Sequence, residues 1–264
     1  MNNIIFGVYN GYDSLKTANG GIYYFMKSLR KHNPDCKVVI ICEKHNIFNE
    51  LELFSKEMNF EIFTDFNVKY SMMYYRFEIY RNYLNHLNEQ NIKFDKILLS
   101  DINDVIFQED PFSILFTEEL YCALEHNTFC QDTYSSNLNM YWAQESNHLS
   151  ENNYESYKHN NVVCAGTILG SYLGIVKYLD FYKNTQDGKI VNDQGLLNVY
   201  VYNYLSSKKL LPYKESKILT LDGLLFDSLN IDTNKNVLNS NNEKYSIIHQ
   251  INRCNLPFML SLVE

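Results

Sequence analysis

Residues 96–112 read KILLSDINDVIFQEDPF, and this segment decides how the rest of the chain is interpreted. Its first five residues form a short apolar run of the kind that makes a buried strand. Two carboxylates, Asp101 and Asp104, follow at the point where this strand ends. Ligands of open α/β sheets bind in the crevice at the carboxyl ends of the strands. The segment therefore predicts a strand that delivers two acidic side chains to a binding site.

The spacing of Asp101 and Asp104 requires a bend in the chain. Side chains three residues apart on a straight strand point to opposite faces, so the chain must turn after Asp101 for both carboxylates to converge. Asn103 is a residue type suited to such a turn. Hard oxygen ligands favour Mg²⁺ or Mn²⁺ over zinc, and such a cation usually completes its octahedron with water and substrate phosphates. The alternative is that the two acids simply remain in water.

Short apolar runs alternate with helical patterns along most of the chain, which is typical of βα units that build a mostly parallel sheet. We expect strands at residues 4–9, 37–42, 60–63, 96–100, 119–124, 162–169 and 245–249. We expect helices at residues 19–31, with Asn19 as the N-cap, and at 48–58, 71–88, 172–183 and 193–205. Residues 131–161 are polar and aromatic without periodicity, and they predict a long loop.

Composition bounds the class of protein. The chain has 264 residues, of which 45% are hydrophobic, and this suits a single domain with a sizeable core. The formal net charge of -8 opposes nucleic acid as a partner, because such binding depends on Lys and Arg that displace counterions. The six cysteines form no C-x-x-C pair, so free thiols are expected rather than a zinc site or a disulfide framework.

The distribution of apolar residues predicts a soluble, cytoplasmic protein. No apolar run approaches the roughly 18 residues that a spanning helix needs. The apolar stretch at residues 4–8 has no basic segment before it and is too short for a signal sequence. The apolar tail at residues 256–263 is a candidate for docking on a partner or a membrane surface.

Four short motifs carry a family resemblance. SDINDVIF at residues 100–107 resembles the metal motif of GT-A glycosyltransferases, and its spacing is most similar to the glycosyltransferase domain of the procollagen lysyl hydroxylases. Glycogenin-like enzymes are more distant relatives in this comparison. CAGTILG at 164–170 is similar to the strand that lines the donor site, NDQG at 192–195 to the D-D-Q motif, and YSIIHQ at 245–250 to the late strand whose histidine completes the metal site. The resemblance spans residues 4–250 at the level of element order.

The resemblance implies a GT-A-like α/β domain, with a Rossmann-like central mixed sheet flanked by helices. Its nucleotide-binding part would cover about residues 1–110 and its acceptor-side part about 111–264. It implies transfer of a hexose from a nucleoside diphosphate sugar, UDP-linked by preference, to a hydroxyl of a glycan or protein. Mn²⁺ or Mg²⁺ would be held by Asp101, Asp104 and His249, and would stabilise the charge that develops on the diphosphate leaving group. For His249 alone, a satisfied core histidine is the alternative.

The resemblance also assigns roles near the reacting sugar. Asp193 would accept a hydrogen bond from the acceptor hydroxyl or act as its base, although it could equally cap a helix. Gln194 would contact the reacting sugar, and Gly166 would let the donor approach the backbone, unless it marks a bulge. The chain departs from the motifs at two positions, with Cys164 in place of Asn and Asn192 in place of the first Asp of D-D-Q.

Four residues are further candidates for contacting the donor. Arg76 precedes the metal strand on a predicted helix and suits phosphate or sugar, because a guanidinium matches phosphate geometry. Tyr9 and Tyr12 follow the first strand and could stack on the base, with core packing as the alternative for Tyr9. Asn103 lies between the two carboxylates in the sequence and is also a candidate for contacting the donor.

Other functions remain open at this stage. A catalytically silent nucleotide- or carbohydrate-binding protein on the same fold is the main alternative, and a metal-dependent phosphohydrolase is a third. The predicted 131–161 loop contains Trp142, the single tryptophan, and is hypothesised to fold over the site as a stacking surface. Asp232 begins a partial match to a calcium loop, but Val237 occupies the position that needs glycine, so a polar loop is expected there.

Overall fold

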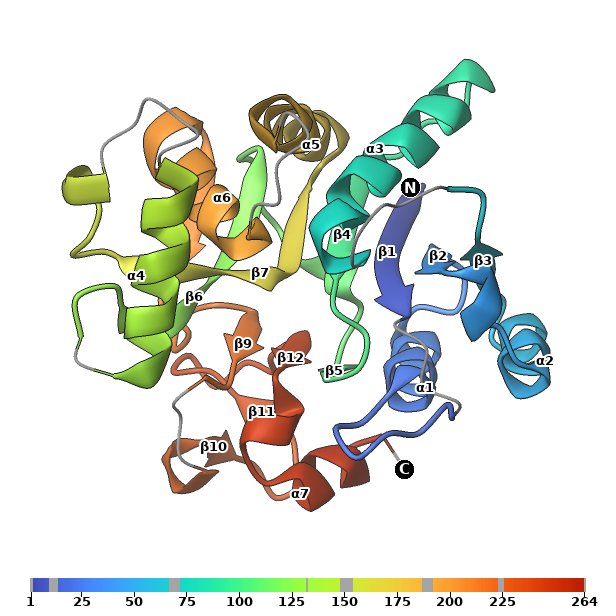
Figure 1. Ribbon diagram of the computed structural model, residues 1–264. Coiled ribbons are helices and arrows are strands. Elements are labelled where there is room, and N and C mark those ends of the chain that lie inside the picture. The colour runs from blue at the N-terminus through green and yellow to red at the C-terminus, as the bar shows by residue number, and fades with distance from the viewer. Residues whose placement is uncertain are drawn as a thin grey trace.

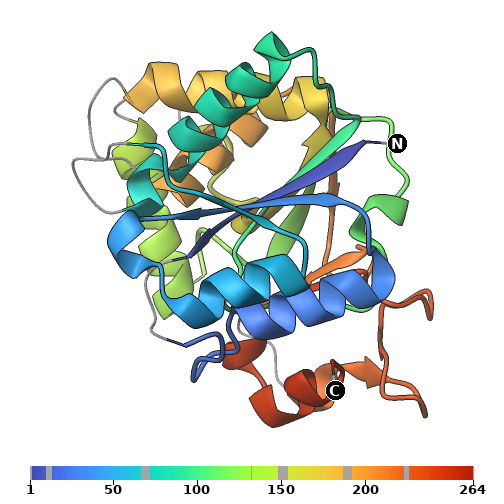
Figure 2. The same ribbon diagram turned by 90° about the vertical axis from the view of Figure 1, so that its right-hand side faces the viewer.

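The computed structural model describes residues 2–9, 14–66, 72–131, 133–147, 154–186, 192–222 and 226–263. These residues form an α/β structure whose central seven-stranded mixed sheet is flanked by helices on both faces (Figure 1, Figure 2). No helix within these ranges is long and apolar enough to cross a membrane. All six cysteines are free, as expected.

The central sheet has the strand order β3-β2-β1-β4-β7-β6-β8. Its strands are β1 (Asn3–Tyr9), β2 (Lys37–Cys42), β3 (Glu61–Phe63), β4 (Lys96–Ser100), β6 (Leu120–Thr128), β7 (Asn161–Ser171) and β8 (Lys208–Leu211). β7 runs antiparallel to both of its neighbours, whereas the other pairs are parallel. The chain builds β2 and β3 on one side of β1 and then returns to its other side for β4. This reversal creates a crevice at the carboxyl ends of β1 and β4.

The helices of the sheet are α1 (Ile22–His32), α2 (Asn49–Glu57), α3 (Met72–Glu89), α4 (Tyr134–Asn147), α5 (Tyr172–Gln186) and α6 (Asp193–Val199), which continues into a π-helical turn at Tyr200–Tyr204. α1 and α2 cover one face of the sheet, and α3 and α5 cover the other (Figure 2). Side chains alternate between two cores, with Phe6 and Leu99 on one face and Ile5 and Leu98 on the other. This period of two explains why both strands read as continuous apolar runs.

The first helix starts later than predicted, because two glycines form a turn before it. α1 begins at Ile22 with Gly21 as its N-cap, so the assignment of Asn19 as the cap is wrong. Gly20 and Gly21 both have positive φ, at 122° and 104°. The amide of Gly21 donates to the carbonyl oxygen of Asn103 at 2.6 Å, and a Cβ on Gly20 would lie 2.5 Å from that oxygen. The turn therefore holds the bend that follows β4.

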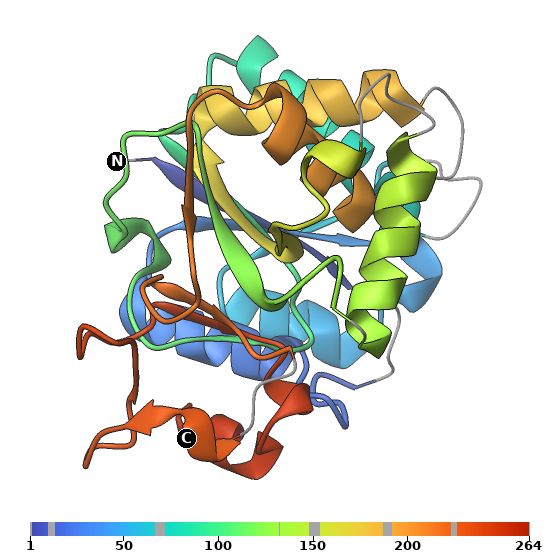
Figure 3. The ribbon, with the colours of Figure 1, turned by 90° about the vertical axis from the view of Figure 1, so that its left-hand side faces the viewer.

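The prediction of a long loop at residues 131–161 is wrong. The first half of this segment folds as helix α4, and its later part contains a short 3₁₀ turn at Tyr154–Ser156. α4 packs beside α6 (Figure 3), and a Cβ on Gly195 of α6 would lie 2.3 Å from the carbonyl oxygen of Trp142. The buried positions of α4 have helical spacing but are mostly polar: Ser136, Asn139, Ala143 and Ser146. An apolar periodicity was therefore absent from the sequence.

A small second sheet lies below the crevice and has the order β5-β12-β9. It consists of β5 (Val105–Phe107), β12 (Ile247–His249) and β9 (Ile218–Thr220), with β12 antiparallel to β5 and parallel to β9. The predicted strand at 245–249 is thus shortened to its last three residues, and β5, β8 and β9 were not predicted.

The end of the chain packs on the small sheet. β10 (Asn230–Ile231) and β11 (Val237–Leu238) form a hairpin around the polar loop that begins at Asp232. Helix α7 (Leu256–Ser261) buries Met259 in the core of the small sheet, and the surrounding tail residues pack there too. The apolar tail therefore docks on the protein itself. The remaining short 3₁₀ turns are Lys44–Asn46, Pro111–Ser113, Phe226–Ser228 and Ile251–Arg253.

Candidate metal centre and pocket

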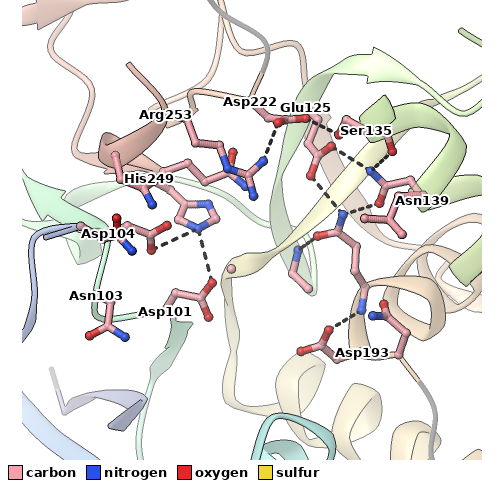
Figure 4. A pocket seen from close by; sticks show the side chains of 18 of the residues that line it. Asp101, Asn103, Asp104, Glu125, Ser135, Asn139, Asp193, Asp222, His249 and Arg253 are labelled. Carbon is pink, nitrogen blue, oxygen red and sulfur yellow. Dashed lines mark hydrogen bonds and ion pairs between the residues drawn. The ribbon is translucent and has the colours of Figure 1, made fainter. Parts of the chain in front are cut away.

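Three side chains from separate elements converge at the end of β4. β4 ends at Ser100 and β5 begins at Val105, so Asp101 and Asp104 lie on the predicted bend between them. The pairing of β12 with β5 places His249 opposite Val105, next to Asp104. One ligand atom from each of Asp101, Asp104 and His249, called here the metal trio, lies within 4.8 Å of the others. Nε2 of His249 is 3.4 Å from Oδ2 of Asp101 and 3.8 Å from Oδ1 of Asp104 (Figure 4).

Gly166 on β7 leaves the space that the metal trio occupies. A Cβ at this position would lie 2.2 Å from Cε1 of His249 and 2.8 Å from Oδ2 of Asp101. The backbone of Gly166 also accepts a hydrogen bond of 2.7 Å from the amide of Asp101. Glycine is therefore required at this position by the protein's own side chains, His249 and Asp101. Two carboxylates and one imidazole, brought this close, form a donor set that could hold a divalent metal ion.

Arg76 on α3 is the main counter-charge of this centre. It is buried and forms ion pairs with Asp101 and Asp193. Burial acts to raise the pKa of Asp101, but Arg76 and His249 outweigh it and hold that pKa well below its usual range. The pKa of Asp104, which lacks the arginine, is raised by burial. The pKa values of the two carboxylates are therefore shifted in opposite directions even though both lie beside His249.

The imidazole of His249 is oriented by a thiol. Its Nδ1 lies 3.3 Å from Sγ of Cys164, so Nε2 is the nitrogen that faces the two carboxylates. Burial acts to lower the pKa of His249, but Cys164 and the carboxylates raise it well above its ordinary value. A metal ion would take the place of that proton, since a ligating histidine must be neutral. The departure from the motif at Cys164 thus supplies the outer contact that ligating histidines commonly have.

Asp193 is not the cap of α6. That role belongs to Asn192, whose side chain accepts from the amide of Gly195 at 3.0 Å. The carboxylate of Asp193 is consequently available to pair with Arg76, and its other oxygen accepts from the amide of Gln194 at 2.7 Å. The second departure from the motif, Asn192, therefore has a structural explanation as the helix cap.

These residues line one pocket of about 640 Å³. The structure brings together the following predicted residues in its lining: Arg76, Asp101, Asn103, Asp104, Trp142, Gly166, Asp193, Gln194 and His249. Trp142 reaches the pocket from helix α4 rather than from a loop. Arg76 reaches it with two of its guanidinium nitrogens bound to carboxylates.

Tyr9, one of the two tyrosines proposed to stack on a base, is not among the described residues that line this pocket. Tyr9 is 1% exposed, its hydroxyl donates to the carbonyl oxygen of Ser14, and its ring lies 6.2 Å from that of Phe48. The core-packing alternative therefore describes Tyr9. Tyr12 lies outside the described residues.

The sequence analysis gave no role to five further residues of the pocket lining: Glu125, Asn139, Asp222, Gln250 and Arg253. Glu125 offered one signal, because an acid inside the apolar strand LYCALEHNT is out of place there. Gln250 ends the YSIIHQ motif but was given no role there. The remaining three follow no motif, since they come from α4, from the segment after β9 and from the turn after β12.

Comparison with known proteins adds no assignment. No family model matches the chain, and no curated protein matches its sequence significantly.

Proposed function

We propose that this protein is a divalent-metal-dependent glycosyltransferase with a GT-A-like fold, which transfers a hexose from a nucleoside diphosphate sugar, UDP-linked by preference, to a hydroxyl of a glycan or protein. The observation that carries the proposal is the convergence of Asp101, Asp104 and His249 at the carboxyl end of β4. This is the sheet edge at which open α/β folds bind their ligands. A pocket of about 640 Å³ is also within the range that accommodates a nucleotide or sugar ligand.

The charge of the pocket favours a diphosphate that arrives with a metal ion. Arg76 and Arg253 are the arginines among the described lining residues, no lysine lies among them, and both arginines form ion pairs with carboxylates. A diphosphate entering alone would therefore meet acidic side chains without a free cation. When bound at the metal trio, Mn²⁺ supplies the positive charge that stabilises the leaving diphosphate.

The remaining chemistry falls to side chains of this chain. Arg76 connects the metal ligand Asp101 with Asp193 and so fixes the distance between the metal site and the candidate base. Asp193 would accept the proton of the acceptor hydroxyl as the new glycosidic bond forms and the bond to the diphosphate breaks. Gln194 holds the adjoining strand, because its Oε1 accepts from the amide of Ala165 at 3.1 Å.

A thermal-shift panel tests the proposal. The protein would be titrated with UDP- and GDP-sugars in the presence and absence of Mn²⁺. A bound donor stabilises the folded state by mass action, by about 2.7 kcal/mol at a concentration 100 times its Kd. We expect a rise in Tm that requires both the nucleotide sugar and Mn²⁺, followed by slow release of free sugar. No Mn²⁺-dependent shift with any nucleotide would refute the proposal, and binding without any cleavage would favour a silent binding protein.

A further inference from the structure

The side of the pocket opposite the metal trio is built differently from the metal centre. Glu125, Asn139 and Gln194, called here the polar wall, come from β6, α4 and α6 (Figure 4). The Nε2 group of Gln194 donates to Oε1 of Glu125 at 3.1 Å and also to the side-chain oxygen of Asn139. Asn139 donates in turn to Oε2 of Glu125 at 3.4 Å. Three elements thus place one carboxylate among two amides.

Glu125 lacks the counter-charge that the other carboxylates of the pocket have. Asp101 and Asp193 pair with Arg76, and Asp222 pairs with Arg253 at 2.5 Å. Glu125 is 3% exposed, and within the described part of the chain it makes no ion pair. Burial, with a smaller contribution from Asp222, raises its pKa to about 7. A buried carboxylate without a cation destabilises a protein, so its presence in a pocket calls for a functional explanation.

A second acceptor lines the same pocket without a partner. The side chain of Gln250 is buried, with 7% of the residue exposed, and its Oε1 has no hydrogen-bond partner within the described residues. Its backbone is left-handed, with φ of 62° and ψ of 40°, directly after the metal-trio residue His249. Non-glycine residues in this conformation are unusual and cluster at ligand-binding sites. A buried amide oxygen of this kind requires a hydrogen-bond donor.

Hydroxyl groups match these two features together. A hydroxyl donates one hydrogen bond and accepts others, so it can donate to the carboxylate of Glu125 or to the amide oxygen of Gln250. A carboxyl group that titrates near neutral pH can also change from hydrogen-bond acceptor to donor, since its protonated form carries an O–H group. A cation would instead favour the closely spaced carboxylates of the metal trio.

We infer that the polar wall, together with Gln250, is a saccharide subsite in which Glu125 receives the hydrogen bond of a sugar hydroxyl. The inference rests on the proposed function for the identity of the saccharide, which is either the transferred hexose or the acceptor. In both cases the same hydroxyl chemistry meets the same wall, opposite the metal trio.

The test uses Glu125→Ala, Glu125→Gln and Asn139→Ala in the full chain, with Glu145→Gln as the matched control on the exposed side of α4. Calorimetry would compare three probes: UDP with Mn²⁺, UDP-glucose or UDP-galactose with Mn²⁺, and methyl hexosides alone. We expect UDP affinity to stay within about twofold in all variants. The gain in affinity from the attached sugar, or the affinity for the methyl hexoside, should fall by about tenfold or more in Glu125→Ala, as for the loss of a hydrogen bond to a charged group.

The probes separate the sources and the failures. A loss of affinity for the nucleotide sugar assigns the polar wall to the transferred hexose. A loss of affinity for the methyl hexoside assigns it to the acceptor. Unchanged sugar affinity in Glu125→Ala, or a wild-type protein that binds no sugar-bearing probe better than UDP and no hexoside, overturns the inference. A wild-type protein that binds hexoside but never UDP with Mn²⁺ refutes the proposed glycosyltransferase and leaves the subsite standing. Melting curves control for folding, and Glu125→Gln should not melt below wild type.

Discussion

The metal trio and the polar wall face each other across one pocket, yet they satisfy their buried acids in opposite ways. At the metal trio, Asp101 is compensated by Arg76 and His249, which hold its pKa low. At the polar wall, Glu125 has only amide partners, and burial raises its pKa to about 7. One side is therefore organised around positive charge, whereas the other is organised around hydrogen bonding.

This difference indicates which ligand atoms each side accepts. A site that holds two carboxylates close together gains most from a divalent cation and the phosphates that accompany it. A site that holds a half-ionised carboxyl group among amides gains most from neutral hydroxyls. Under the proposed function, the two halves would bind the two ends of a nucleotide sugar, and variants that act on one half should spare the other.

The largest effect is expected at the metal trio. Asp104→Ala should reduce Mn²⁺-dependent binding of UDP by more than about 100-fold, because even changes in outer-shell contacts cost 10- to 100-fold in metal affinity. The folded state should keep its stability, since removing one of two close acids relieves repulsion. Calorimetric titration with Mn²⁺ and UDP measures the effect. Asp232→Ala, in the polar loop between β10 and β11, is the control, and equal Mn²⁺ dependence in both variants would contradict the assignment.

The next effect concerns the link between the halves. Asp193→Asn should leave donor binding in place but slow donor cleavage by about 10² to 10⁴, as for the loss of a general base. It should also lower the stability by about 2 kcal/mol, because Arg76 loses one of its two charged partners. Release of free sugar from the donor and urea denaturation measure these quantities. The control is Asp180→Asn, which removes the carboxylate of the Arg81 ion pair outside the pocket and should leave donor cleavage unchanged. A wild-type cleavage rate in Asp193→Asn would assign Asp193 a purely structural role.

The third effect is a pH dependence of stability. The folded-state pKa of Glu125 is raised from its usual 4.5 to about 7, so the folded protein binds the extra proton between these values. Its contribution is fully favourable below pH 4.5 and is lost as pH rises through 7, at a cost on the order of 3 kcal/mol. Glu125→Gln should therefore be more stable than wild type at pH 8 and similar at pH 5. Thermal denaturation between pH 5 and pH 8 measures this difference in stability. If the Tm values of wild type and Glu125→Gln change in parallel with pH, the pKa of Glu125 is not raised.

The smallest effect is expected from the thiol behind His249. Cys164→Ala should lower Mn²⁺ affinity by about tenfold, because the imidazole loses the contact that orients Nε2 toward the carboxylates. Cys164→Ser should retain most of the affinity, since a hydroxyl can still accept from Nδ1. Nitrogen chemical shifts of His249 report the tautomer directly. An unchanged tautomer and an unchanged affinity in Cys164→Ala would show that packing alone orients the ring.

Much of the central sheet was predictable because its strands are buried on both faces. β1, β2 and β4 are continuous apolar runs, and such runs leave few alternatives to a covered parallel sheet. The small sheet was not predictable in the same way. β5 and β9 have three residues each and depend on pairing with β12, so their formation is decided by contacts between distant segments.

The sequence by itself determined the alternating α/β architecture and the two acids at the end of β4, because burial and strand-end position are local properties that residue patterns record. Tertiary structure alone decided what those acids meet. No local sequence pattern predicts that Arg76 pairs with Asp101 and Asp193. Nor does any predict that residue 166 must lack a side chain to leave room for His249. The same holds for Glu125, whose neighbours are supplied by α4 and α6. Charge compensation and close approach depend on distances between segments far apart in the chain, and only the folded arrangement sets those distances.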